Sequence, residues 1–159
     1  MEPENPERDP VRSSYETSGD ARPMTISVVV PVYNSELSLE ELVVGLAKVL
    51  PNVCERFELI LVNDGSRDRS WEVVQSLVDR HGWVRGVDML RNYGQHNALL
   101  CGVRAARHDV IVTMDDDLQH PPEELPRLLE RLGEGYDVVY GTRLSTRRPH
   151  RRSKSSGSP

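Results

Sequence analysis

Three consecutive aspartates, Asp115, Asp116 and Asp117, follow a short apolar run of residues. Like charges ~4–6 Å apart repel by a few kcal/mol at an effective dielectric constant of ~20, and in an extended segment Asp115 and Asp117 point to the same side. A divalent cation would turn this repulsion into attraction. An all-oxygen ligand set that includes the Gln119 amide suits Mg²⁺ or Mn²⁺ better than zinc. We favour a metal site here over the simpler alternative, a solvated acidic loop that caps the following helix.

A further acidic residue, Asp64, lies in an Asn-Asp-Gly-Ser sequence at residues 63–66. Asp and Gly are common turn residues, so a turn with a helix cap explains this sequence. A carboxylate that accepts hydrogen bonds from a base or ribose explains it equally well, and both interpretations stay open. Pro31 ends another apolar run, and with Tyr33 it could form a flat apolar wall for an aromatic base.

Basic residues gather near the end of the chain. Arg143 could bind a phosphate through its bidentate guanidinium group, and a solvated arginine is an equally good interpretation. The cluster at residues 147–154 is either a solvated tail or a segment attracted to anionic lipid, at ~1 kcal/mol per charge, and thus a peripheral membrane contact. His96 and His120 are expected at the surface or in helix caps, without a catalytic role.

The composition predicts one folded domain between two polar ends. The chain has 159 residues and is 37% apolar, and both ends are poor in apolar side chains. We expect a disordered acidic tail at 1–23, a domain at 24–145 and a flexible basic tail at 146–159. The net charge is −5, and acids outnumber bases in the central segment. This excess argues against nucleic acid as a partner, because phosphate binding needs a basic face.

The cysteines and the apolar runs predict a cytoplasmic protein. Cys54 and Cys101 lie far apart in apolar contexts, which indicates reduced core thiols rather than a disulfide or metal site. No apolar run reaches the ~20 residues of a membrane span. The acidic, Pro-rich start does not resemble a signal peptide.

Short β-branched runs alternate with amphipathic patterns along the central segment. This alternation predicts an α/β fold, a parallel sheet with helices on both faces. The expected strands are 26–32, 57–62, 84–90, 110–114 and 138–140, and the expected helices are 39–49, 71–78, 98–105 and 125–132. Ser38 is expected to cap the first helix, and Asp68 or Ser70 the second.

Ligands of open parallel sheets bind at the carboxyl ends of the strands. The polar sequences described above follow those ends, so one edge of the sheet should hold the site. The chain has neither G-x-G-x-x-G after the first strand nor a P-loop. A dinucleotide-dependent dehydrogenase and a P-loop NTPase are therefore excluded as first hypotheses.

Five motifs in this order resemble the family 2 glycosyltransferases of GT-A fold, in the branch that transfers sugars to polyprenyl phosphates, such as dolichol-phosphate mannose synthase. The motifs are V-V-V-P-V-Y-N at 28–34, V-N-D-G-S at 62–66, R-N-Y-G-Q-H-N-A-L at 91–99, D-D-D-L-Q-H-P-P-E at 115–123 and Y-G-T-R at 140–143. The resemblance covers residues 24–143. It implies a Rossmann-like GT-A sandwich, cut off at its C-terminal side.

The resemblance also implies roles for individual residues. The nucleotide sugar would contact Pro31, Tyr33, Val62, Asp64, Asp115, Asp116 and Arg143. The cation, Mg²⁺ or Mn²⁺, would be held by Asp115, Asp117 and Gln119, and Asp115 and Asp117 would be catalytic. Two positions depart from the family pattern: Ser35 stands where the family has Glu, and Asp116 where it has a small residue.

The implied reaction moves a sugar from a UDP- or GDP-sugar to a polyprenyl phosphate at the cytoplasmic face of the membrane. Family members continue past Y-G-T-R with acceptor-side loops, amphipathic helices and often two membrane spans. Donor binding is therefore a safer expectation for this chain than turnover. The alternatives are a transferase that acts on a polysaccharide and a non-catalytic module that binds a sugar nucleotide. A receiver-type signalling domain is set aside, because its acids follow the first strand, whereas the acidic cluster here follows the fourth.

Overall fold

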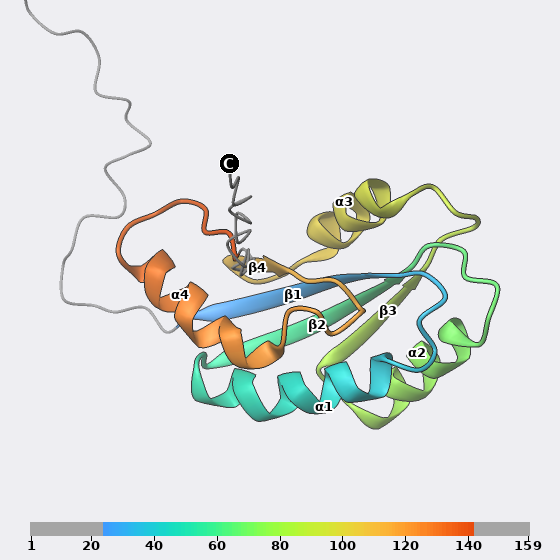
Figure 1. Cartoon of the computed structure of the whole chain (residues 1–159), viewed down its shortest axis with the longest axis horizontal. Coiled ribbons are helices and arrows are strands. Elements are labelled where there is room, and N and C mark those ends of the chain that lie inside the picture. Colours follow the sequence, from blue (N-terminus) through green and yellow to red (C-terminus); the bar gives the residue numbers. More distant parts are fainter. Residues whose placement is uncertain (1–23, 142–159) are drawn as a thin grey trace, which may run out of the picture.

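The computed structural model describes residues 24–141, which form a four-stranded parallel sheet with helices on both faces (Figure 1). The strand order is β3-β2-β1-β4, so the first two strands of the chain lie in the middle of the sheet. The strands are β1 (Thr25–Val32), β2 (Arg56–Asn63), β3 (Val84–Asp88) and β4 (Val110–Thr113). Every residue of β1 is buried, as expected for a central strand that is apolar on both faces.

The helices follow the strands in alternation. They are α1 (Leu39–Val49), α2 (Ser70–Arg80), α3 (Gln95–Ala105) and α4 (Leu125–Gly133), with short 3-10 turns η2 (Leu50–Asn52) and η3 (Pro122–Glu124). Helices α1, α2 and α4 cover one face of the sheet, and α3 covers the other (Figure 1). In this part of the chain, no helix has the length and apolar character needed to cross a bilayer.

Alternate residues of the central strands pack on opposite faces. Val28 and Val30 of β1 belong to the larger core beneath α1 and α2, whereas Val29 belongs to a smaller core with Ala98 of α3. At Gly102 of α3, a Cβ atom would lie 2.3 Å from a methyl carbon of Val29. The absence of a side chain at this glycine therefore lets α3 approach the sheet closely.

The predicted α/β fold is confirmed, and the first four predicted strands are present. Residues 138–140 were also predicted as a strand, and this is wrong: they form no strand. Within the described sheet, β4 pairs only with β1. Val138 and Tyr140 stay 62% and 84% exposed, so the segment has neither a ladder partner nor burial to stabilise it. The predicted tails at 1–23 and 146–159 lie outside the described residues.

The predicted helix caps differ in their outcome. Ser38 occupies the N-cap position of α1 without a side-chain capping bond, because its hydroxyl donates to the Ser35 carbonyl. Asp68 accepts hydrogen bonds from the backbone N–H of Ser70, at 3.0 Å, and from the Ser70 hydroxyl, at 2.6 Å. The N-cap residue of α2 is Arg69, and it makes no side-chain capping bond, so the prediction of Asp68 or Ser70 as the cap is wrong, although Asp68 contacts the first residue of the helix.

Candidate functional site

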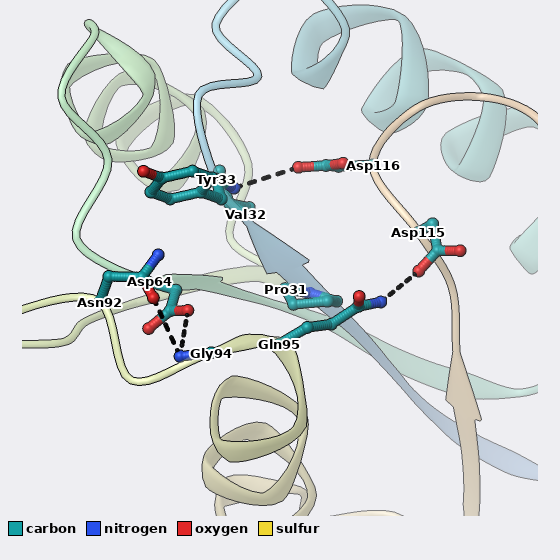
Figure 2. A pocket seen from close by; sticks show the side chains of 9 residues that line it. All are labelled: Pro31, Val32, Tyr33, Asp64, Asn92, Gly94, Gln95, Asp115 and Asp116. Carbon is teal, nitrogen blue, oxygen red and sulfur yellow. Dashed lines mark hydrogen bonds between the residues drawn. The ribbon is translucent and has the colours of Figure 1, made fainter.

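A pocket of about 240 Å³ opens at the carboxyl ends of the strands. Its walls come from the end of β1, the loops after β1, β2, β3 and β4, and the start of α3, which the parallel topology brings to one edge (Figure 2). The lining residues are Pro31, Val32, Tyr33, Asp64, Asn92, Gly94, Gln95, Asp115 and Asp116. Five of the residues named from the sequence therefore lie together, at the place where ligands of open parallel sheets bind.

Asp64 holds the loop between β3 and α3. Its side chain is buried, with 2% exposed, and its two oxygens accept the backbone N–H groups of Tyr93, at 2.7 Å, and Gly94, at 2.9 Å. Gly94, the N-cap residue of α3, has a φ of 90°, which favours glycine. Gly65 has a φ of 65°, and a Cβ there would lie 2.5 Å from the backbone nitrogen of Asn92. The second and third strand-end loops are thus packed tightly against each other.

The two pocket aspartates after β4 each contact a different neighbouring element. Asp115 accepts a hydrogen bond of 2.8 Å from the side-chain amide of Gln95, at the start of α3. Asp116 accepts a hydrogen bond of 3.3 Å from the backbone N–H of Tyr33 and a short one from the Ser35 hydroxyl. Figure 2 shows these aspartates on the far side of the pocket from Asp64. The acidic loop is therefore fastened both to α3 and to the loop after β1.

Asp117 and Gln119 do not line the pocket. Both are exposed, and an Asp117 oxygen accepts the backbone N–H of Gln119 at 2.9 Å. Leu118 between them has a φ of 58°, so the chain turns there. Among residues 24–141, no three His, Cys, Asp or Glu side chains come together as a metal site.

The donor chemistry of the acidic loop nevertheless fits a hard divalent cation. The polar groups of Asp115, Asp117 and Gln119 offer oxygen ligands, which Mg²⁺ and Mn²⁺ prefer. Within the described part of the chain, none of the ion pairs includes an aspartate of this loop. The groups that donate hydrogen bonds to these aspartates are neutral amides and a hydroxyl. The negative charge of the aspartates therefore remains available to a cation.

Two other residues named from the sequence have different outcomes. Val62 is fully buried in the smaller core beneath α3 and is not a lining residue. Arg143 lies outside the described residues. Tyr33 is 45% exposed and lies at the pocket with Pro31, as the flat apolar wall requires.

Four lining residues were not predicted individually: Val32, Asn92, Gly94 and Gln95. The last three belong to the R-N-Y-G-Q-H motif after β3. The position of this motif could have indicated them, because it follows β3, and β3 is the sheet neighbour of β2. The hydrogen bond from Gln95 across to Asp115 had no counterpart in the sequence pattern.

Asp68 and Ser70, at the start of α2, form hydrogen bonds with the loop after β1. Burial alone would raise the pKa of Asp68, but hydrogen bonds from the Ser70 hydroxyl and backbone N–H, and from the Glu36 backbone N–H, outweigh it and lower this pKa. The Ser70 hydroxyl also accepts the backbone N–H of Ser35 at 2.8 Å. Asp68 and Ser70 thereby connect the start of α2 to the loop after β1.

A partly buried ion pair joins β2 and β3 near their amino ends, at the other edge of the sheet from the pocket. Glu58 of β2 accepts hydrogen bonds from Arg85 of β3, at 2.7 Å, and from the Ser27 hydroxyl, at 2.8 Å. Burial alone would raise the pKa of Glu58, but hydrogen bonds from Arg85, Ser27 and the Arg107 backbone N–H, together with the Arg85 charge, lower it. Arg85 also donates to the carbonyl of Ala105, the last residue of α3, so this network fixes the C-terminal end of α3.

Known proteins resemble this chain in sequence and in fold. The sequence model of the family "Glycosyl transferase family 2" matches residues 27–156. The undecaprenyl-phosphate 4-deoxy-4-formamido-L-arabinose transferase of Pseudomonas paraeruginosa is 50% identical over 123 residues, which cover 77% of this chain and 36% of that protein. This chain therefore spans about a third of the length of this curated relative.

Solved structures with a similar fold include two nucleotide complexes. TarS 1–349 from S. aureus in complex with UDP-GlcNAc is 25% identical, with a TM-score of 0.56 over 70% of this chain and 32% of that chain. Glucosyl-3-phosphoglycerate synthase from Mycobacterium tuberculosis, in complex with Mn²⁺, UDP and glucosyl-3-phosphoglycerate, is 28% identical, with a TM-score of 0.54 over 69% of this chain and 39% of that chain. The resemblance stated from the five motifs is confirmed. Because the family model matches most of its length, this chain belongs to glycosyl transferase family 2.

Proposed function

We propose that this chain binds a UDP- or GDP-sugar in the pocket and supplies the donor-binding part of a transferase that glycosylates a polyprenyl phosphate. One observation carries the proposal: Asp64, Asp115 and Asp116 meet Pro31 and Tyr33 in a single pocket at the carboxyl edge of a parallel sheet. This arrangement offers a flat apolar surface beside several hydrogen-bond acceptors, which suits a base and a ribose. Bound UDP-GlcNAc and UDP in the TarS and synthase structures support this choice of ligand.

Asp64 would recognise the base or the ribose. Each of its oxygens accepts one backbone N–H, and a carboxylate has about four lone-pair sites in all. The unused sites can accept a ring N–H, which uracil and guanine both carry, or a ribose hydroxyl. The backbone bonds fix the carboxylate in place, so the ligand binds to a preorganised acceptor.

Asp115, Asp117 and Gln119 would hold a Mg²⁺ or Mn²⁺ ion, which when bound would neutralise negative charge on the leaving diphosphate. The synthase structure with bound Mn²⁺ supports a divalent ion. Arg143 would contact a phosphate through its guanidinium group. The carboxylates of the loop would also repel the diphosphate without the ion, so donor affinity should depend on the metal.

The name of the Pseudomonas relative indicates a polyprenyl phosphate acceptor. In the proposed step, an acceptor phosphate oxygen attacks the anomeric carbon, the bond from that carbon to the diphosphate oxygen breaks, and the nucleoside diphosphate leaves. A phosphate monoester has its second pKa near ~6 and is largely ionised at pH 7. The acceptor phosphate therefore needs orientation more than a general base. The described residues that line the pocket include no histidine.

Calorimetric titration with UDP and GDP, each with Mn²⁺ and with EDTA, tests donor binding. We expect the full chain to bind one of them in Mn²⁺ and at least tenfold more weakly in EDTA. Asp117→Ala should lose this metal dependence. Asp79→Ala, which changes an exposed aspartate of α2, should bind like the unchanged chain. Equal affinity under all conditions would refute the role of the metal.

Transfer needs a separate assay, in which the chain receives a radiolabelled UDP- or GDP-sugar and a polyprenyl phosphate in detergent. Labelled lipid would support the complete proposal. Donor binding without labelled lipid would reduce it to a sugar-nucleotide-binding module. Labelled oligosaccharide from a polysaccharide acceptor would instead indicate the other class of transferase.

A further inference from the structure

One contact across the pocket has no assigned role. The side-chain amide of Gln95 donates to a carboxylate oxygen of Asp115 at 2.8 Å (Figure 2). Within residues 24–141, this is the only side-chain hydrogen bond that the Asp115 carboxylate makes. Asp115 is exposed and lies next to two further aspartates. Without this contact, charge repulsion and solvation would favour rotamers that turn the carboxylate away from its neighbours and from the pocket.

The backbone of Gln95 is held in place by contacts of α3 and of the residue before it. It is the first residue of α3, directly after Gly94, whose backbone N–H donates to the buried Asp64. Further along α3, Gly102 packs closely against the sheet. The path from Asp64 through Gly94 and Gln95 to Asp115 therefore joins the acids on the two sides of the pocket.

The chemistry of the amide matters as well as its place. A lysine or arginine here would neutralise the Asp115 charge with an ion pair. The neutral Gln95 amide orients the carboxylate and leaves its negative charge intact. This combination suits a carboxylate that must stay in a fixed direction and still attract a cation.

We propose that Gln95 is a positioning residue, which holds Asp115 toward the pocket for the metal-bound diphosphate of the donor. This inference rests on the proposed function. Loss of one hydrogen bond to an exposed charged group should weaken Mn²⁺-dependent UDP binding about five- to twenty-fold. The affinity for UDP in EDTA should not change, because Gln95 acts through Asp115 on the metal-bound form.

The test uses Gln95→Met in the full chain, since methionine keeps the length of the side chain and removes the amide. Gln75→Met, at an exposed position of α2, is the matched control. UDP binding is followed by NMR titration, which reaches millimolar affinities. The titration is run once in Mn²⁺-free buffer and once with Mn²⁺, where binding is read from the relaxation effects of the bound ion. Thermal unfolding of each variant checks that the fold is retained.

A double-mutant cycle with Asp115→Ala separates positioning from a direct contact. We expect Gln95→Met to have less than a twofold effect once Asp115 is absent. Full additivity, an equal loss in EDTA, or an unchanged affinity in Gln95→Met would each overturn the inference while the proposed function stands. If the unchanged chain binds neither UDP nor GDP with Mn²⁺, the proposed function fails, and the inference fails with it.

Discussion

Replacement of Asp64 by alanine should remove the contact that organises the pocket. The Tyr93 N–H, at 2.7 Å from the carboxylate, loses its acceptor, and the Gly94 N–H, at 2.9 Å, keeps only the Asn92 side-chain oxygen, at 3.1 Å. A hydrogen bond to a charged group contributes about 1.5–3 kcal/mol, so two would contribute about 3–6 kcal/mol in a fully buried site. Tyr93 is 42% exposed, and water can reach the freed groups. We therefore expect the free energy of unfolding to fall by about 2–4 kcal/mol.

Urea unfolding of Asp64→Ala measures this loss, with Asp79→Ala as the exposed aspartate control. Native-state hydrogen exchange should show faster exchange at the amides of Tyr93 and Gly94, because the Tyr93 N–H would be bonded only to water and the Gly94 N–H would keep only its bond to the Asn92 side-chain oxygen. The free energy of unfolding of Asp64→Asn should lie between those of Asp64→Ala and the unchanged chain. The amide oxygen of asparagine can replace one carboxylate oxygen, whereas its NH₂ group cannot accept a hydrogen bond.

Two results would refute this reasoning. The first is a free energy of unfolding for Asp64→Ala within about 0.5 kcal/mol of the unchanged chain, the range of an ordinary surface substitution. The second is unchanged exchange at both amides. Either would mean that the loop after β3 keeps its conformation without the Asp64 carboxylate.

Other substitutions test the packing, the partly buried ion pair and the acidic loop. Gly102→Ala places a Cβ 2.3 Å from a Val29 methyl carbon, so the free energy of unfolding in urea should fall by about 1–3 kcal/mol despite the better helix propensity of alanine. The lowered pKa of Glu58 means that its ionised form stabilises the fold above its unfolded value of about 4.3, and that this stability is lost as pH falls through the folded pKa. Unfolding of Glu58→Gln, measured from pH 3 to 7, should therefore depend less on pH in the acid range. Ser35→Glu should weaken Mn²⁺-dependent UDP binding by repulsion of Asp116, and Asp116→Ala should relieve that loss.

The fold was predictable because the strands have a strong local signal. Residues 26–32 and 57–62 are apolar on both faces, which is typical of central parallel strands. The predicted strand at 84–90 ends earlier, at Asp88, because its partner β2 ends opposite it at Asn63. A strand continues only where a neighbour offers hydrogen bonds, and that information is not local. The absent strand at 138–140 has the same cause.

The site was predictable where it depends on strand ends alone. Pro31, Asp64 and Asp115 follow or end strands, so the topology places them at one edge. The contact of Gln95 depends on a side chain that reaches across the pocket, which no periodicity indicates. The burial of Val62 depends on which face of β2 it occupies, and a shift of one residue in a strand reverses that face.

The two departures from the family pattern prove to be one feature. Ser35 and Asp116 are far apart in the sequence, yet the Ser35 hydroxyl donates to the Asp116 carboxylate. A glutamate at position 35 would bring a second carboxylate to the same place, and the two charges would repel. A small residue at 116 would leave the Ser35 hydroxyl without this acceptor. Each departure is therefore compatible with the other, and Asp116 is a link between the acidic loop and the loop after β1 as well as an added charge in the pocket.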